Sequence, residues 1–147
     1  MGNKYKQAVL SNLPAHKKIP LIKGKLDDGE QTPLLDFSAF DNYQWWRAEE
    51  GDCEFQKALV GLRDNSKRTW KAIRTENAKR DHPIPAGAII AEATRRLVEI
   101  KLDDIDEFWR FRFQGEQRLW GYKQGRVFLV IWWDPHHKIC PSTLKNT

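Results

Sequence analysis

The stretch that decides the fold is residues 108–141, which read FWRFRFQGEQRLWGYKQGRVFLVIWWDPHHKICP. Turn signals around Gly115 and Gly125 divide it into three short runs that are rich in aromatic and β-branched residues. Runs of this kind, separated by glycine-containing turns, are typical of antiparallel strands joined by hairpins. The stretch therefore predicts a three-stranded meander whose last strand ends at a turn beginning with Asp134.

The strands of this meander differ in how their side chains alternate. In the first strand, Trp109 and Phe111 alternate with arginines, which is the period-two pattern of a half-buried strand. The last strand, 127–133, is apolar on both parities, as expected of a central strand covered on both faces. Six side chains are expected to face the helices of the domain: Trp109, Phe111, Phe113, Phe128, Val130 and Trp132.

Three arginines share one face of the meander. If the first turn centres on Gly115, Arg112 lies opposite Arg118. The same register places Arg110 opposite Trp120. Like charges that face each other across a hairpin are destabilising. We therefore expect an anion, or acidic side chains, to offset the repulsion.

Such an arginine cluster is a candidate phosphate site, because a guanidinium binds phosphate through two hydrogen bonds and does not deprotonate. In this interpretation Arg110 and Arg112 bind nucleic acid. Trp120 and Tyr122, on the same parity, would stack on its bases. The alternative is that the arginines pair with acidic neighbours in the sequence. These neighbours are Glu107, Glu116 and the run 103–106.

The run DPHHK follows the last strand, and its Asp and Pro fit the first two positions of a type I turn. Histidine exchanges protons near neutral pH, and a cation such as Lys138 or Arg118 stabilises phosphate as charge builds on it. We therefore take His137 as the candidate acid or base, with His136 as its alternate, in metal-independent RNA cleavage through the 2′-hydroxyl. The alternative is a solvated basic corner.

Two further groups of basic residues are each open to two interpretations. His82 either approaches the sheet and completes an acid–base pair or is an ordinary surface histidine, and the second reading is favoured. Lys71 and Arg74 lie on a basic helix face, which either binds an RNA backbone or is simply solvated.

Hydrophobic spacing predicts the elements that precede the meander. A helix over 52–63 can be capped by its first residue, an aspartate, and its apolar residues recur with helical spacing. Further helices are expected over 66–75 and 86–100. The segment 79–85 between them reads as a loop, because proline disfavours helix at the residue before it. A first strand is expected at 34–40.

The chain has 147 residues, 40% of them hydrophobic and 31% charged, which favours one globular domain. We expect residues 1–33 to form an irregular basic arm and residues 34–147 to form one α+β domain. In that domain two or three helices pack on one face of an antiparallel sheet of about four strands.

Composition and motifs exclude several classes of function. The net charge of +5 and the pI of about 9.3 favour an acidic partner, either nucleic acid or an acidic protein. P-loop, GxGxxG, GxSxG and HExxH motifs are absent, and Cys53 and Cys140 form no metal-binding pair. We therefore expect no metal, no cofactor and two reduced thiols. No signal peptide or membrane span is recognisable, so a cytoplasmic protein that does not bind membranes is expected.

Residues 108–141, with two arginine-bearing strands, an apolar strand and a terminal basic turn, resemble the RelE/ParE-like toxins of bacterial toxin–antitoxin systems. Members of that family place an αα-hairpin before an antiparallel sheet, which matches the order of elements expected here. RelE-type members cleave mRNA in the ribosomal A site. The resemblance implies that Arg112 and Arg118 neutralise phosphate. It also implies that His137 with Lys138 takes the place of the family's C-terminal catalytic group.

The resemblance further implies RNA, the ribosome and an acidic antitoxin protein as partners. This chain departs from the family in its greater length, its N-terminal arm and its additional helix, and it lacks the lysine-rich strand of some members. ParE-like members share the fold without the nuclease residues and act on gyrase. Two functions therefore stay open: a toxin-like RNA-cleaving enzyme, and a non-enzymatic protein that binds nucleic acid or inhibits a cellular protein.

Overall fold

The computed structural model describes residues 29–43, 46–76 and 78–141, so most of the expected arm lies outside the described residues. Within them, five strands form: β1 (Leu34–Asp36), β2 (His82–Pro85), β3 (Glu107–Arg112), β4 (Arg118–Gln124) and β5 (Val127–Asp134). The helices are α2 (Cys53–Asn65), α3 (Trp70–Glu76), the short 3-10 helix η2 (Ala86–Ala88) and α4 (Ala91–Glu99). None of the described helices has the length and apolar character needed to cross a membrane.

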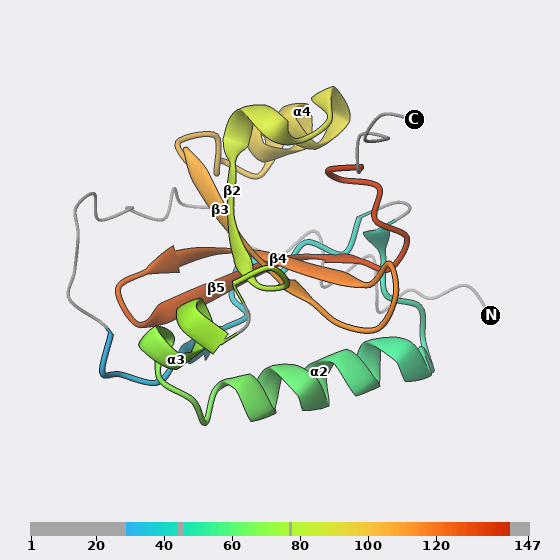
Figure 1. Ribbon diagram of the computed structural model, residues 1–147. Coiled ribbons are helices and arrows are strands. Elements are labelled where there is room, and N and C mark those ends of the chain that lie inside the picture. The colour runs from blue at the N-terminus through green and yellow to red at the C-terminus, as the bar shows by residue number, and fades with distance from the viewer. Residues whose placement is uncertain (1–28, 44–45, 77, 142–147) are drawn as a thin grey trace, which may run out of the picture.

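The five strands form one sheet in the order β1-β5-β4-β3-β2 (Figure 1). The meander β3-β4-β5 is antiparallel as predicted, and β2 pairs antiparallel with β3. β1 runs parallel to β5, so the sheet is mixed, and the expectation of an antiparallel sheet of about four strands is corrected. The added strand, β2, occupies part of the expected loop at 79–85. Its two prolines are tolerated because β2 is an edge strand.

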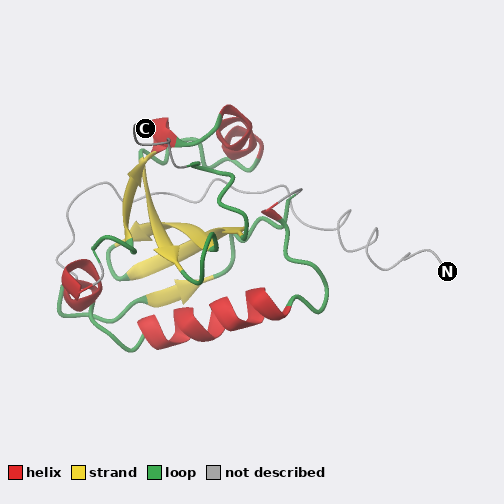
Figure 2. Ribbon diagram, turned by 45° about the vertical axis from the view of Figure 1, so that its right-hand side comes forward, coloured by secondary structure: helices red, strands yellow, loops and turns green. Residues whose placement is uncertain are grey.

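The sheet is covered on both faces (Figure 2): α2 and α3 share one face, in line with the expectation of two helices there, whereas α4 covers the other, so the expectation of three helices on one face is wrong. One buried cluster joins α2 and α3 to residues that include Phe111 and Phe128. The other joins α4 to residues that include Phe108, Trp120 and Trp132. Because β3 and β5 carry large apolar side chains on both parities, a single layer of helices would leave half of them exposed.

A β-bulge in β5 decides which tryptophan lies on which face. Trp120 pairs with Trp132, whereas the next residue, Gly121, pairs with Val130, so Ile131 has no partner of its own. Simple alternation places Trp132 with Val130, but the extra residue shifts Trp132 to the α4 face, and that prediction is wrong. The other expected residues do lie on the face of α2 and α3: Trp109, Phe111, Phe113, Phe128 and Val130.

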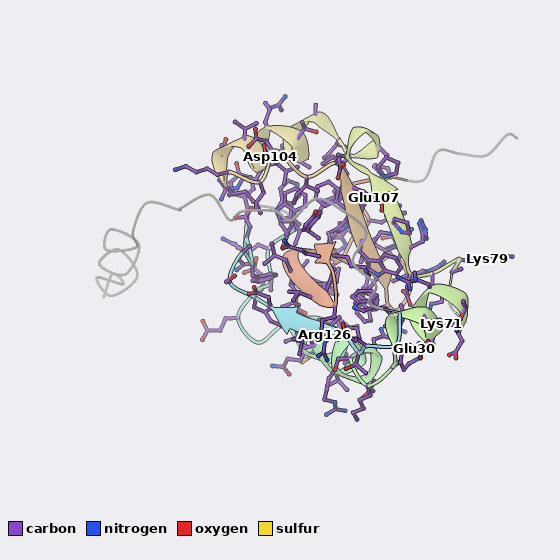
Figure 3. All side chains as sticks on the ribbon, turned by 90° about the vertical axis from the view of Figure 1, so that its left-hand side faces the viewer. Glu30, Lys71, Lys79, Asp104, Glu107 and Arg126 are labelled. Carbon is purple, nitrogen blue, oxygen red and sulfur yellow. The ribbon has the colours of Figure 1, made fainter. Side chains whose placement is uncertain are left out.

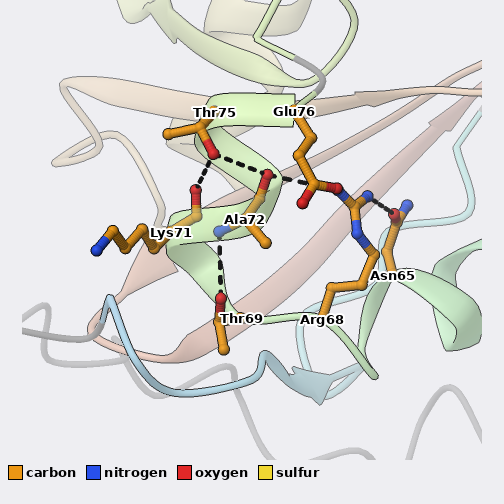
Figure 4. Close-up of polar contacts among 7 residues, drawn as sticks. All are labelled: Asn65, Arg68, Thr69, Lys71, Ala72, Thr75 and Glu76. Atoms are coloured by element: carbon orange, nitrogen blue, oxygen red, sulfur yellow. Dashed lines mark hydrogen bonds and ion pairs between the residues drawn. The ribbon is translucent and has the colours of Figure 1, made fainter.

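The helix boundaries follow local capping. Asp52 accepts two backbone N–H groups of the first turn of α2, each at 3.0 Å, as predicted for its N-cap. α3 begins later than expected, because the cap is Thr69, whose Oγ1 accepts the N–H of Ala72 at 3.2 Å (Figure 4). Ser66 instead closes the end of α2. α4 is shorter than the expected helix over 86–100, because residues 86–88 form η2.

Candidate active site

The three arginines lie on the same face of the sheet as Trp120, which is the face that α4 packs against. The predicted register is confirmed, because Arg112 pairs with Arg118 across the hairpin. Arg110 pairs with Trp120 in the same ladder. The connecting turn contains Gly115 with a φ of 58°, in the left-handed region that favours glycine. A local turn therefore brings two like charges directly opposite each other.

Arg118 is almost completely buried, with 5% of its surface exposed. Its Nη1 donates to the carbonyl oxygens of Gly115 at 2.7 Å and Gln117 at 2.9 Å. Its buried Nε has no hydrogen-bond partner among the described residues. Burial, followed by repulsion from Arg110 and Arg112, lowers the pKa of Arg118 to about 10. A buried cation in this state is stabilised by an anion that accepts its remaining N–H group.

Arg110 lies between two imidazoles. Its Nη2 is 3.1 Å from Nε2 of His82, and its Nη1 is 3.5 Å from Nε2 of His137. The centre of the guanidinium lies 5.7 Å from the ring centroid of Trp120, which supports it from the sheet. Burial lowers the pKa of Arg110, and repulsion from Arg112 acts in the same direction. The cluster therefore holds a guanidinium whose polar neighbours are both uncharged bases.

The hydrogen-bond pattern defines the state of both histidines. A guanidinium only donates, so each imidazole accepts at Nε2 and is neutral in this arrangement. Nδ1 of His82 lies 3.0 Å from the carbonyl oxygen of Pro83, so it carries the proton. Burial, followed by repulsion from Arg118 and Arg110, lowers the pKa of His137 and favours the same neutral form. His82 therefore joins the site, and its interpretation as an ordinary surface histidine is corrected.

Two buried carboxylates border the cluster, and both bind N–H groups rather than guanidinium groups. Asp134 is fully buried and accepts the indole N–H of Trp120 at 3.2 Å, together with two backbone N–H groups of the following turn. Asp81 accepts the backbone N–H of Arg112 at 3.0 Å, and burial raises the pKa of its carboxyl. Neither carboxylate therefore forms a direct ion pair with the arginines.

The alternative that acidic sequence neighbours pair with these arginines is not found. Among the described residues, no carboxylate lies within ion-pairing distance of Arg110, Arg112 or Arg118. Figure 3 shows Asp104 and Glu107 at the end of the molecule that carries α4. The positive charge of the cluster is consequently not neutralised by direct contacts within the described part of the chain.

The two aromatic residues predicted to stack on bases differ in how far they are buried. Trp120 has no exposed surface, packs edge-on against Phe108 with ring centroids 6.1 Å apart, and donates its N–H to Asp134. A fully buried ring has no free face for a base, so this prediction is wrong for Trp120. Tyr122 is half-buried against the α4 cluster, and burial raises the pKa of its hydroxyl.

Lys71 and Arg74 belong to α3, which packs on the opposite face of the sheet. Figure 3 shows Lys71 beside Glu30, with which it forms an ion pair at 3.7 Å. Arg68 pairs with Glu76 across the same helix (Figure 4). The basic face of α3 is therefore partly neutralised, and it is not brought to the arginine cluster.

The other residues of the basic turn are more exposed than His137. The side chains of His136 and Lys138 form no hydrogen bond to the cluster within the described part of the chain. Cys53 and Cys140 are both free thiols. The described residues contain no group of three or more His, Cys, Asp or Glu side chains suited to hold a metal ion.

A scan against protein-family models, a search of curated proteins and a search of solved structures each found no match to this chain. The resemblance to RelE/ParE-like toxins therefore stays a prediction. His82, Arg110 and His137, with Arg112 and Arg118 beside them, form the candidate active site.

Proposed function

We propose that this protein is a toxin-like, metal-independent endoribonuclease that acts on mRNA in the cytoplasm. The observation that carries the proposal is the guanidinium of Arg110, which lies between the Nε2 atoms of His82 and His137 and is paired with no carboxylate of the described residues. RNA cleavage through the 2′-hydroxyl needs a base, an acid and a cation around one phosphate. These three groups meet here at one point on the sheet.

The arginines supply the phosphate-binding part of the proposed mechanism. Arg112 is exposed and next to the buried Arg118, whose Nε lacks a partner in the described residues. A phosphate bound over this face accepts hydrogen bonds from the guanidinium groups, and its negative charge offsets the repulsion between them. The same contacts stabilise the additional negative charge of the pentavalent transition state.

The histidines supply proton transfer. His137, whose pKa is lowered, is present as a neutral base and takes the proton of the 2′-hydroxyl as O2′ attacks phosphorus. His82 is the proposed acid: when RNA binds, its Nε2 exchanges the contact with Arg110 for a proton from solvent and donates that proton to the departing 5′-oxygen, while its Nδ1–H stays on Pro83. The P–O5′ bond breaks as the O2′–P bond forms, so the products are a 2′,3′-cyclic phosphate and a 5′-hydroxyl. His136 and Lys138 are exposed, and the ammonium group of Lys138 adds positive charge along the RNA.

The proposed partners follow from charge and from the resemblance described above. A chain of net charge +5 with three arginines on one face of its sheet attracts RNA, and the ribosome presents mRNA at high local concentration. An acidic antitoxin protein that covers the same face would block cleavage.

The second candidate function is non-enzymatic binding of nucleic acid, or inhibition of a cellular protein, through the same face. It is favoured by the absence of direct ion pairs to the three arginines among the described residues, which suits anion binding with or without proton transfer. In this reading the histidines only complete the hydrogen bonding of Arg110.

The test compares His137→Ala, Arg112→Ala and a matched control, Arg63→Ala, whose arginine is exposed on α2 and pairs with Asp64. Purified proteins are incubated with single-stranded RNA in EDTA, and cleavage and binding are measured separately. We expect His137→Ala to bind RNA but to cleave it about 10²–10⁴-fold more slowly. Arg112→Ala should weaken binding and reduce its salt dependence by roughly 0.7 in log K per log salt. Arg63→Ala should match the wild type.

The outcomes separate the two functions. Binding that depends on Arg112, without any cleavage by the wild-type protein, selects the non-enzymatic function. RNA binding that is equally affected by Arg63→Ala and Arg112→Ala rejects the arginine face for both functions.

A further inference from the structure

The carboxylate of Asp134 lies at the centre of the turn that carries His137. It is fully buried and accepts three hydrogen bonds. These come from the backbone N–H of Lys138 at 2.8 Å, the backbone N–H of Ile139 at 3.1 Å and Nε1 of Trp120 at 3.2 Å. Two of the donors flank His137 on its C-terminal side, and the third belongs to the ring that supports Arg110. The carboxylate therefore ties the turn to the floor of the arginine cluster.

His137 itself is in a conformation that needs such support. Its φ is 55°, in the left-handed region that is unfavourable for a residue with a Cβ. Positive charge from Arg110 and Arg118 also acts on its imidazole. The local backbone preference and the repulsion that follows protonation would both move the ring away from the sheet.

We propose that Asp134 is a positioning residue for the reaction proposed above, because it holds His137 beside Arg110 by fixing the turn over residues 134–139. The inference rests on the proposed function for its catalytic consequence. Its structural part, the placement of His137, is measurable without RNA. Replacing the carboxylate with an amide removes acceptor capacity and places an N–H group against backbone donors.

The groups that face His137 define what each outcome means. Arg110 and Arg118 on the sheet lower the pKa of its imidazole, as burial does, whereas Asp134 and Glu116 act to raise it. If Asp134 only contributed charge, Asp134→Asn would lower the pKa of His137 further. If Asp134 positions His137, the same substitution releases the ring into solvent, and its pKa rises towards the ordinary value of about 6.5.

The experiment is an NMR titration of His137 in the full-length wild-type protein, in Asp134→Asn and in Asp41→Asn. Asp41 is a matched control, because it also accepts a buried indole N–H, from Trp132 at 3.0 Å, but it pairs with Arg96 and accepts no N–H group of the turn that carries His137 among the described residues. We expect the pKa of His137 to rise in Asp134→Asn and to stay unchanged in Asp41→Asn. RNA cleavage by Asp134→Asn should fall by about 100-fold, the size associated with a misplacement of ~1 Å. A pKa that falls or does not change in folded Asp134→Asn overturns the positioning role.

A second measurement decides the matter if Asp134→Asn does not fold. In the wild-type protein, the amide protons of Lys138 and Ile139 should exchange with solvent as slowly as those of β5, although they lie in a turn. Exchange at the rate of an unstructured chain would overturn the inference. A wild-type protein that shows both NMR signatures but does not cleave RNA would reject the proposed function while leaving the placement of His137 by Asp134 intact.

Discussion

Two partly buried arginines, Arg96 on α4 and Arg110 on β3, meet opposite environments on the same side of the sheet. Arg96 makes a bidentate pair with Asp41 at 2.8 and 2.9 Å and a further hydrogen bond to Glu99 at 2.6 Å. It lies 4.0 Å from the ring centroid of Tyr43. Hydrogen bonding to Asp41 is the main cause that raises the pKa of Arg96. This guanidinium is neutralised within the fold.

Arg110 also lies over an aromatic ring, but its two side-chain acceptors are neutral imidazoles and its pKa is lowered. The difference separates an arginine that is neutralised within the fold, Arg96, from one that we propose binds a ligand, Arg110. At Arg96 the fold supplies the counter-charge. At Arg110 the fold supplies uncharged acceptors, and the nearby carboxylate of Asp134 accepts backbone N–H groups instead of pairing with the guanidinium. An anionic ligand can therefore supply the negative charge that the fold does not place beside Arg110.

The largest expected effect is a loss of RNA cleavage when one of the imidazoles beside Arg110 is removed. His82→Ala removes the proposed acid, and RNA cleavage should fall by about 10²–10⁴-fold. The matched change at the other arginine is Glu99→Ala, which removes one acceptor from Arg96 and should leave cleavage unchanged. Initial rates on a defined RNA check both. Cleavage by His82→Ala within twofold of wild type would remove His82 from the mechanism.

The second effect is a loss of stability when the ion pair between Arg96 and Asp41 is broken. Arg96→Ala leaves the carboxylate of Asp41, whose side chain is only 11% exposed, without its bidentate partner. We expect a loss of about 2 kcal/mol in unfolding free energy, below the ~3–5 kcal/mol typical of a fully buried pair because Arg96 is partly exposed. This corresponds to a decrease of roughly 4–8 °C in melting temperature. An unchanged melting temperature would contradict the structural role of Arg96.

The third effect concerns pH and sharpens the difference between the two sites. The pKa of His137 is lowered, chiefly by burial, so its neutral form is favoured in the fold. Activity that uses this neutral form should therefore be nearly full at pH 7 and should fall as pH drops below the ordinary histidine value of about 6.5. The contribution of this group to stability has the same sign, and it is also lost towards acid. The rate of RNA cleavage, measured against pH in EDTA, checks this. Full loss of cleavage in EDTA would contradict the mechanism, and so would a rate that does not change between neutral and mildly acidic pH.

The smallest effect concerns repulsion within the arginine cluster. Arg112→Gln removes one of two facing charges, so it should stabilise the protein by about 0.5 kcal/mol, within the range measured for cross-strand pairs. Inorganic phosphate should raise the melting temperature of the wild type more than that of this variant, because bound anion stabilises the native state. Arg63→Gln serves as the control for loss of an exposed charge. Equal phosphate effects in all three proteins would show that the cluster does not bind phosphate.

The parts of the fold that depend on neighbouring residues were predictable from the sequence. The turn at Gly115 fixes the register of β3 and β4, so the pairing of Arg112 with Arg118 follows from a few residues. The cap at Asp52 and the antiparallel meander are equally local. Local turn chemistry and periodicity carry this information within single hairpins and helices.

The parts that depend on distant contacts were not predictable in the same way. His82 reaches Arg110 across a separation of 28 residues, through pairing of a proline-containing strand that reads as a loop. The placement of α4 opposite α2 depends on how the whole sheet is covered, and no single segment encodes it. Asp134 is predicted as a turn residue, but its hydrogen bond from Trp120 depends on the pairing of β4 with β5.

The unpaired Ile131 in β5 has a consequence for how chains of this kind are compared. It behaves as an insertion that the strand has absorbed, because Trp132, Trp133 and Asp134 stay in phase with their partners on β4. A relative that is one residue shorter at this point would keep the same side chains on the same faces. A one-residue gap in an alignment at this point would therefore indicate a shorter β5, with the residues after the gap still paired with the same positions of β4.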